Sequence, residues 1–108
     1  MARVFQLQRR LQARLNGGRV PDAGEDVQYV KDMFLALYDE VGEALRTTPW
    51  KPWKKRQELD REEMKEELVD MLHFFVNLCL AAGMDADELY RRFEGKNREN
   101  HDRQDGGY

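Results

Sequence analysis

The sequence predicts an all-α fold, a helical bundle of about four helices in a single domain, residues 1–108. Three observations indicate this class. Apolar residues recur at intervals of three and four along most of the chain, acidic capping boxes precede three of these periodic segments, and no segment carries the signals of a β-hairpin. A chain of this length without internal repeats forms one small domain.

The first two helices are delimited by glycines and acidic residues. The first helix is expected over residues 3–15, because apolar residues lie there at helical spacing and the pair Gly17 and Gly18 follows as a stop signal. Asp22 and Glu25 have the spacing of a capping box. The second helix is therefore expected to open there and to run to about residue 45.

Two further capping boxes open the remaining helices after a proline-containing loop. Asp60 with Glu63 predicts the start of a third helix that ends at Ala82. Asp85 with Glu88 predicts the start of a fourth helix, and its polar continuation is either a frayed helix or a tail. The expected inner face of the fourth helix consists of Leu89, Tyr90 and Phe93.

The third helix is apolar around almost its whole circumference between residues 71 and 82. A helix of this kind lies at the centre of a bundle. Because three partner helices in so short a chain do not cover it on all sides, we expect a second copy to complete the bundle. The default is a two-fold homodimer, with a tetramer as the alternative.

Two pairs of carboxylates, Glu40 with Glu43 and Glu67 with Asp70, stand beside the predicted core stripes of the second and third helices. Antiparallel helices joined by a loop bring such pairs together, and clustered carboxylates repel one another unless a cation binds between them. Oxygen ligands suit a hard divalent cation, so we predict that these four residues bind Mg²⁺, with Mn²⁺ as a substitute. The core stripes themselves are expected to be Val27, Val30, Phe34, Leu37, Val41, Ala44 and Leu45 in the second helix and Met64, Leu68, Met71, Leu72, Phe75, Cys79 and Ala82 in the third.

Two other interpretations of these acids stay open. The chain contains 21 Asp and Glu, so pairs at this spacing also occur on ordinary solvated faces. A di-iron carboxylate bundle would use an acid followed three residues later by histidine, as in Asp70 and His73. Such a site needs two of these elements, however, and the only other histidine is His101. His73 is otherwise expected to be a hydrogen-bonded helix residue or an interface residue.

Composition and charge exclude several classes of function. The net charge of −3 argues against a general binder of nucleic-acid polymers, which needs a basic face. The single cysteine, Cys79, lies in an apolar run and is interpreted as a small buried residue of a reduced compartment. The longest apolar stretch, 68–84, is short for a bilayer, and the N-terminus has no hydrophobic signal segment. We therefore expect a cytoplasmic protein without a membrane partner.

Two further segments carry groups that suit a nucleotide. The loop after the second helix contains Trp50 and Trp53, whose indole rings can stack on planar bases, interleaved with residues that attract phosphates. These basic residues are Lys51, Lys54, Lys55 and Arg56. Near the C-terminus, Lys96, Asn100 and Arg103 share one helical face and suit a polyphosphate. The alternatives are tryptophans that only cover the end of the bundle and a solvated charged terminus.

Together these elements resemble the dimeric dUTPase branch of the all-α NTP pyrophosphatases, the MazG-like superfamily. The superfamily signature, Glu-x-x-Glu followed by Glu-x-x-Asp, is present at 40–43 and 67–70. The features of the branch are Gln12-x-x-Leu15-Asn16, a loop with tryptophan and lysine at 50–54, an acidic motif that runs into Leu72, His73, Phe74 and Phe75, and a C-terminal pattern of Lys96, Asn97, Asn100, Arg103, Gln104, Gly107 and Tyr108. The resemblance covers the chain from about Gln12 to Tyr108.

The resemblance implies Mg²⁺-dependent hydrolysis of a deoxynucleoside triphosphate to its monophosphate and pyrophosphate. The leading substrate is dUTP, and dCTP or a broad range of nucleotides are alternatives. By the same resemblance the four acids hold the ions, and one of the glutamates activates water. The base and sugar are expected at Gln12, Asn16, Trp53 and Asn77, and the phosphates at Lys54, Lys96, Asn100 and Arg103, with residues 97–108 closing over the substrate.

The chain is shorter than is usual for this branch, which leaves the choice of base open. An interpretation of another class is a non-catalytic helical module for dimerisation or regulation.

Overall fold

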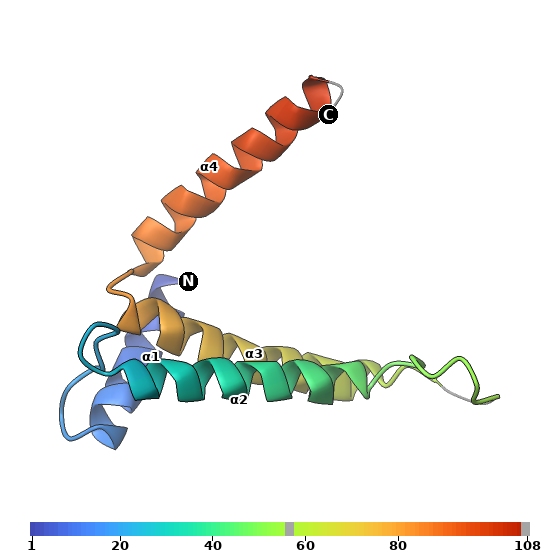
Figure 1. Ribbon diagram of the computed structural model, residues 1–108, viewed down its shortest axis with the longest axis horizontal. Coiled ribbons are helices and arrows are strands. Elements are labelled where there is room, and N and C mark those ends of the chain that lie inside the picture. Colours follow the sequence, from blue (N-terminus) through green and yellow to red (C-terminus); the bar gives the residue numbers. More distant parts are fainter. Residues whose placement is uncertain (56–57, 107–108) are drawn as a thin grey trace.

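The computed structural model describes residues 1–55 and 58–106, and this part of the chain consists of four helices without a strand (Figure 1). The helices are α1 (Ala2–Leu15), α2 (Val27–Leu45), α3 (Arg61–Ala81) and α4 (Ala86–Asp105). The predicted all-α class is therefore confirmed. Arg56 of the basic loop and Gly107 and Tyr108 of the C-terminal pattern lie outside the described residues.

The aspartate half of each capping box predicted for the third and fourth helices is present. The Asp60 carboxylate accepts a hydrogen bond from the backbone N–H of Glu63 (3.1 Å), and the Asp85 carboxylate accepts one from the backbone N–H of Glu88 (2.8 Å). Each bond satisfies one of the unpaired N–H groups in the first helical turn. The polar continuation of α4 is helical as far as Asp105, so of the two predicted alternatives the helix is found.

Glycines with positive φ end two of the helices. Gly18 (φ 91°) follows α1, and its N–H reaches the carbonyl of Ala13 (2.7 Å). Gly83 (φ 78°) follows α3, and the next N–H, of Met84, reaches the carbonyl of Cys79 (2.9 Å). A side chain is strained in this conformation, so glycine is the residue that stops each helix cleanly.

The capping box predicted for the second helix is wrong. The helix begins at Val27, and the Asp22 carboxylate instead accepts from the N–H of Glu25 (3.3 Å) within a turn that precedes it. Asp26 stands at the helix boundary and pairs with Arg19 (2.7 Å). This hydrogen-bonded ion pair holds the pKa of Asp26 below its ordinary value. An acid in a turn and an acid at a cap have the same sequence spacing, which explains the error.

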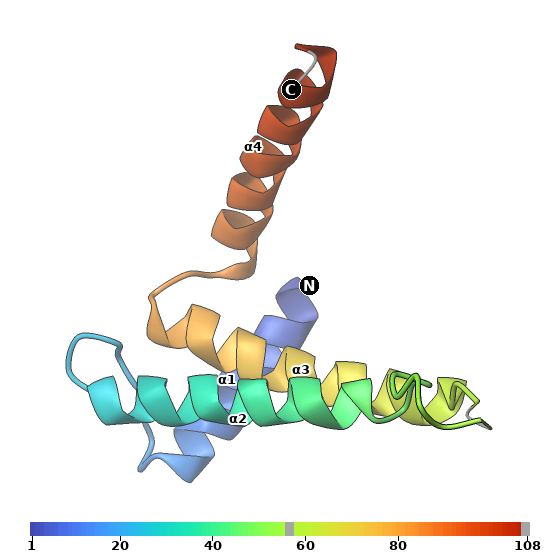
Figure 2. The same cartoon turned by 45° about the vertical axis from the view of Figure 1, so that its right-hand side comes forward.

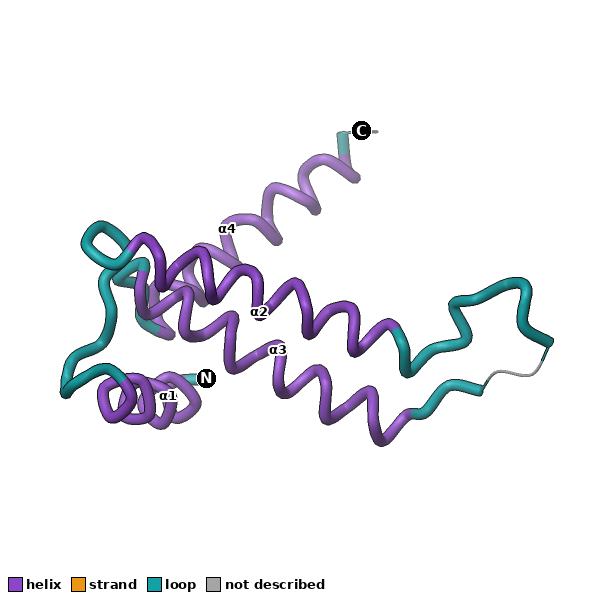
Figure 3. Tube along the Cα trace, turned by 60° about the horizontal axis from the view of Figure 1, so that its bottom comes forward, coloured by secondary structure: helices purple, strands orange, loops and turns teal. Residues whose placement is uncertain are grey.

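Three of the helices form the body of the molecule, and the fourth leaves it. α2 and α3 run side by side as a long antiparallel hairpin, and α1 crosses its α3 side near the end remote from the 46–60 loop (Figures 1 and 3). α4 turns away from α3 by 101° and projects from the body in both ribbon views (Figure 2). No single helix among the described residues is long and apolar enough to cross a bilayer, and only the bent pair α3 and α4 passes that test together.

The core lies where α1 crosses the C-terminal half of α3. Phe5, Val76, Cys79 and Leu80 are buried against one another there. Cys79 is the small buried residue that the sequence predicted, and burial raises the pKa of its thiol. A core of this size covers only one end of the hairpin.

The core stripe predicted for α2 is only partly right for the single chain, because Val30, Leu37 and Ala44 are half-buried and its other four members are exposed. Phe34, Val41 and Leu45 are 58%, 47% and 46% exposed, whereas Met33 and Glu40 of the neighbouring stripe are half-buried against α3. The half-buried face of the helix therefore combines members of both stripes, and it includes Glu40. Phe34, Tyr38, Val41 and Leu45 form what we call the outer face of α2.

Apolar residues of the other helices are also exposed against expectation. Leu68 and Phe75 of the predicted α3 stripe are exposed, and Tyr90 and Phe93 of the predicted inner face of α4 are 63% and 66% exposed. Only Leu89 of that face is half-buried. Because α4 leaves the body, no element of the same chain covers these side chains. Exposed apolar surface of this extent is typical of a protein that associates.

Candidate active site

Carboxylates from α2 and α3 converge near the middle of the hairpin. One oxygen each of Glu40, Glu67 and Asp70 lies within 4.8 Å of the other two. Glu40 and Glu67 are half-buried and Asp70 is exposed, so the cluster opens to solvent on one side. Glu43, one turn further along α2, pairs with Arg46 (3.1 Å) and stays a predicted ligand. Three of the four predicted ligands are thus brought together.

The cluster is electrostatically unfavourable without a cation. A hydrogen bond shared with Glu40, together with partial burial, raises the pKa of Glu67 above its ordinary value. The pKa of Glu63, one turn before it, is raised in the same way by its contact with Glu67. A set of carboxylate oxygens with one open side fits a hard divalent cation that keeps part of its water shell, as Mg²⁺ does.

The raised pKa of Glu67 predicts how stability depends on pH in the absence of a divalent cation. The ordinary value is 4.5, so the folded protein binds this proton more tightly than the unfolded chain does. That contribution to stability is complete below pH 4.5 and is lost as the pH rises through the higher folded-state pKa. We therefore expect Tm, measured in EDTA, to fall as the pH is raised from 4.5 towards neutrality.

Glu67→Gln should flatten this pH dependence and raise Tm at neutral pH. Glu66→Gln, which removes a carboxylate from the exposed side of the same turn, is the matched control and should leave the profile of the wild type. An unchanged profile in Glu67→Gln would show that the cluster does not carry the repulsion.

Polar side chains from three helices meet beside the core. Gln12 and Asn77, both predicted to contact the nucleoside, are 5% and 4% exposed. Gln12 accepts a hydrogen bond from the Tyr29 hydroxyl (2.5 Å), and Asn77 accepts one from Gln8 (2.6 Å). The sequence hypothesis missed Gln8 and Tyr29. The one available signal was the four-residue spacing of Gln8 and Gln12, which places both on one face of α1.

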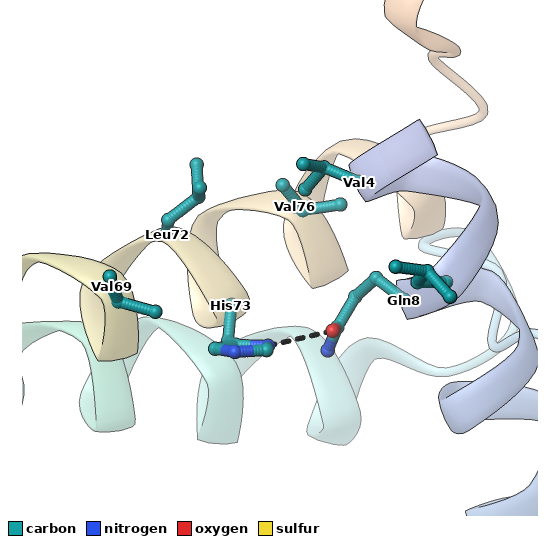
Figure 4. A pocket seen from close by; sticks show the side chains of 7 residues that line it. Val4, Gln8, Val69, Leu72, His73 and Val76 are labelled. Atoms are coloured by element: carbon teal, nitrogen blue, oxygen red, sulfur yellow. Dashed lines mark hydrogen bonds between the residues drawn. The ribbon is translucent and has the colours of Figure 1, made fainter. Parts of the chain in front are cut away.

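Asn16 and His73 border this junction. The Asn16 amide donates to the backbone carbonyl of Gln12 (2.7 Å). His73 is hydrogen-bonded to Gln8 (2.7 Å), as expected for a satisfied helix histidine. Figure 4 shows this contact at the edge of a cavity of about 180 Å³ between α1 and α3. Its lining is Val4, Leu7, Gln8, Val69, Leu72, His73 and Val76.

The tryptophan loop lies at the opposite end of the hairpin from this junction (Figure 3). Trp50 and Trp53 pack edge to face, with ring centroids 5.8 Å apart, and Lys51 stands over the Trp50 ring. Trp53 is 68% exposed. The acid cluster separates Trp53 and Lys54 from Gln12, so these residues do not contact one base together in the single chain.

The predicted phosphate ligands of α4 do not reach the acid cluster of their own chain. Asp70 lies about 17 Å before the end of α3, and Lys96 and Arg103 lie about 15 and 25 Å along α4. With a turn of 101° between the helices, the separation from the cluster is on the order of 20–30 Å. Asn100 lies between these two residues on the same helix. The predicted site residues therefore lie in two separate places in the single chain, the three-helix body and the projecting helix α4.

A family model described as dUTPase matches residues 1–84. The chain belongs to this family. It is 37% identical over 138 residues to a dCTP pyrophosphatase of Enterobacteria phage LZ5, covering 97% of this chain and 80% of that protein. It is 36% identical over 101 residues to a dCTP pyrophosphatase of Enterobacteria phage T4, covering 78% of this chain and 59% of that protein.

A third relative is described as a DNA replication protein of Enterobacteria phage T4. It is 33% identical over 91 residues, which are 68% of this chain and 23% of that protein. No solved structure matches the chain. Membership of the dUTPase family confirms the predicted class, a hydrolase that acts on the phosphoanhydride bond of a nucleotide. The family match ends before α4, and the first relative named above aligns with nearly the whole chain.

Proposed function

We propose that this protein is a Mg²⁺-dependent pyrophosphohydrolase that converts a pyrimidine deoxynucleoside triphosphate to its monophosphate and pyrophosphate. The observation that carries the proposal is the convergence of Glu40, Glu67 and Asp70 within 4.8 Å. The signature motifs favour dUTP, and the relatives described as dCTP pyrophosphatases favour dCTP. Both nucleotides therefore belong in the proposal.

The carboxylates would hold the ion and thereby position the triphosphate. An ion held there would offset the negative charge of the phosphate oxygens, including the charge that develops in the reaction. Glu40 and Glu67 approach from opposite helices, and Asp70 completes the cluster one turn from Glu67. One of the glutamates that surround the ion takes the proton of the attacking water.

The nucleoside is proposed to lie along α3 towards α1. Asn77 is two helical turns beyond Asp70, a separation of about 10 Å. This length is comparable with the reach of a deoxynucleotide from its α-phosphate to its base. Gln12 and Asn16 then contact the base and sugar together with Asn77.

We further propose that the active enzyme is a homodimer in which α4 of one copy serves the acid cluster of the other. The outer face of α2 and the exposed Tyr90 and Phe93 supply apolar surface for association. Lys96, Asn100 and Arg103, which are too far from the cluster of their own chain, would bind the phosphates in the partner's site. The partner would also cover the apolar circumference of α3.

A nucleotide panel tests the proposed reaction. Purified protein with Mg²⁺ is expected to release pyrophosphate from dCTP or dUTP, with Mn²⁺ as a replacement and with no release in EDTA. Comparable rates of pyrophosphate release from all common nucleotides would instead identify the alternative of a pyrophosphohydrolase with broad substrate specificity. No release from any nucleotide, and no change of Tm with Mg²⁺ and a non-hydrolysable analogue, would instead support the non-catalytic helical module.

A further inference from the structure

A chain of hydrogen bonds crosses the junction of the three helices and ends at Asn77. His73 Nδ1 lies 2.7 Å from Gln8 Oε1, Gln8 Nε2 lies 2.6 Å from Asn77 Oδ1, and Asn77 Nδ2 lies 3.5 Å from Met33 Sδ. Figure 4 shows Gln8 reaching from α1 to His73 on α3. Gln8 and Asn77 are 5% and 4% exposed, so water does not readily replace the bond between them, whereas His73 at the end of the series is exposed.

The Met33 thioether at one end determines the direction in which the hydrogen bonds of this series are donated. A methionine sulfur has no proton and only accepts hydrogen bonds. Asn77 therefore turns its NH₂ group towards Met33 and its carbonyl towards Gln8. Gln8 then donates through Nε2, its carbonyl faces the ring of His73, and His73 donates from Nδ1–H. The reverse direction would place the Asn77 carbonyl oxygen against sulfur with no proton between them.

The buried side-chain amide of Gln12 in the same junction is oriented in the same way, with its carbonyl bonded within the protein. The carbonyl oxygen of Gln12 is occupied by the Tyr29 hydroxyl (2.5 Å), and its Nε2 has no hydrogen-bond partner within residues 1–55 and 58–106. Gln12 lies one turn from Gln8 on α1, and Tyr29 lies one turn from Met33 on α2. Gln12 thus lies one helical turn from Gln8, the residue that bonds Asn77. The carbonyls of Gln12 and Asn77 are both engaged, and Gln12 Nε2 and the one N–H of Asn77 that does not face Met33 are left for a ligand.

We propose that Gln8 and His73 are positioning residues that determine the base preference of the enzyme, because they hold the Asn77 amide with its nitrogen, and hence the N–H that does not face Met33, directed to the base. This inference rests on the proposed function. Two donors suit a base edge with neighbouring acceptors, and cytosine presents such an edge in O2 and N3. Uracil carries a proton on N3, which would meet a donor. The polarity of the junction therefore favours dCTP over dUTP.

Gln8→Glu tests the inference because a carboxylate only accepts hydrogen bonds. Glutamate at position 8 still accepts from His73, but it no longer donates to Asn77. The Asn77 amide must then rotate, donate to the carboxylate and turn its carbonyl towards the base. We expect the ratio of kcat/KM for dCTP to kcat/KM for dUTP to fall by about tenfold or more, since a mismatched polar group on one edge of a base is costly. Gln6→Glu makes the same substitution on the exposed side of α1 and should leave this ratio unchanged.

Gln8→Leu removes the bond without adding a charge and is the second variant, should glutamate prevent folding. It frees the amide to adopt either orientation, so the ratio should move towards unity. A ratio within twofold of the wild type in a folded variant, with both rates lowered equally, would reduce Gln8 to a packing residue and overturn the inference.

Two measurements separate this inference from the proposed function. The ¹⁵N NMR signals of His73 should show a proton on Nδ1 in the wild type and its loss from that position in Gln8→Leu. A proton on Nε2 in the wild type would overturn the inference whatever the activity. Dissociation constants for α,β-imido analogues of dCTP and dUTP give the same ratio without turnover. Absence of pyrophosphate release with a clear preference among these analogues would therefore contradict only the proposed reaction.

Discussion

Asp70→Asn is expected to reduce the release of pyrophosphate by about a hundredfold or more. The carboxylate oxygen of Asp70 is one of the three that lie within 4.8 Å of one another, and asparagine keeps its shape while removing its charge. A bound divalent cation contributes several kcal/mol to transition-state stabilisation in phosphoryl chemistry, and each 1.36 kcal/mol corresponds to a factor of ten in rate. The measurement is steady-state release of pyrophosphate from dCTP and dUTP at saturating Mg²⁺.

Asp39→Asn is the matched control for this variant. Asp39 is exposed on α2 next to Glu40, and it is not part of the cluster. The control should keep the activity of the wild type, and both variants should keep a helical spectrum and a cooperative melt. Because Asp70→Asn weakens the repulsion within the cluster, its Tm without Mg²⁺ should not fall. Wild-type turnover in a folded Asp70→Asn would show that the reaction does not use this cluster.

The helical architecture could be predicted from local sequence, because helix boundaries depend on nearby residues. Asp60 and Asp85 accept hydrogen bonds from residues three positions away, and Gly83 supplies the positive φ within one turn of the helix end. Spacing alone failed at Asp22, since a turn uses the same three-residue bond as a cap. Local signals thus define where helices begin and end, and they do not define what each helix faces.

Which stripe of α2 faces α3 could not be read from the sequence. The stripe with Phe34 and Val41 is the more apolar, yet these two residues are exposed while Leu37 of the same stripe is half-buried. The stripe with Met33 and Glu40 packs within the chain although it carries an acid. The exposure of such strongly apolar residues is explained if they contact a second copy of the chain. The same arrangement turns Glu40 towards Glu67, so the misassigned stripe and the acid cluster have one cause.

The contacts of the amide junction are long-range and have no local signature. Gln8 meets His73 and Asn77 across 65 and 69 residues, and these pairs depend on how α1 crosses α3. The direction of α4 depends on the short connection after Gly83, where a few backbone angles decide between folding back and projecting. Sequence spacing predicted which residues share a face, whereas their distance from the acid cluster required the structure.

Mixed dimers are expected to recover activity that neither parent possesses, if α4 serves the partner's site. One parent carries Asp70→Asn. The other carries Lys96→Ala, Asn100→Ala and Arg103→Ala, which remove two positive charges and an amide from one face of α4. In a heterodimer with exchanged arms, one site contains both defects and the other contains none. Half of the sites in the purified heterodimer are intact, so its turnover should reach roughly half of the wild-type value.

The two copies are co-expressed with different tags and purified through both, and native mass confirms the heterodimer. If α4 folded back onto its own cluster, each site of the heterodimer would contain one defect, and purified heterodimers would stay as inactive as the parents. Full activity in the α4 variant alone would contradict any role of these three residues in phosphate binding. A monomeric wild type would contradict the exchange itself. The result therefore decides whether the separation of about 20–30 Å within one chain is bridged by a second copy.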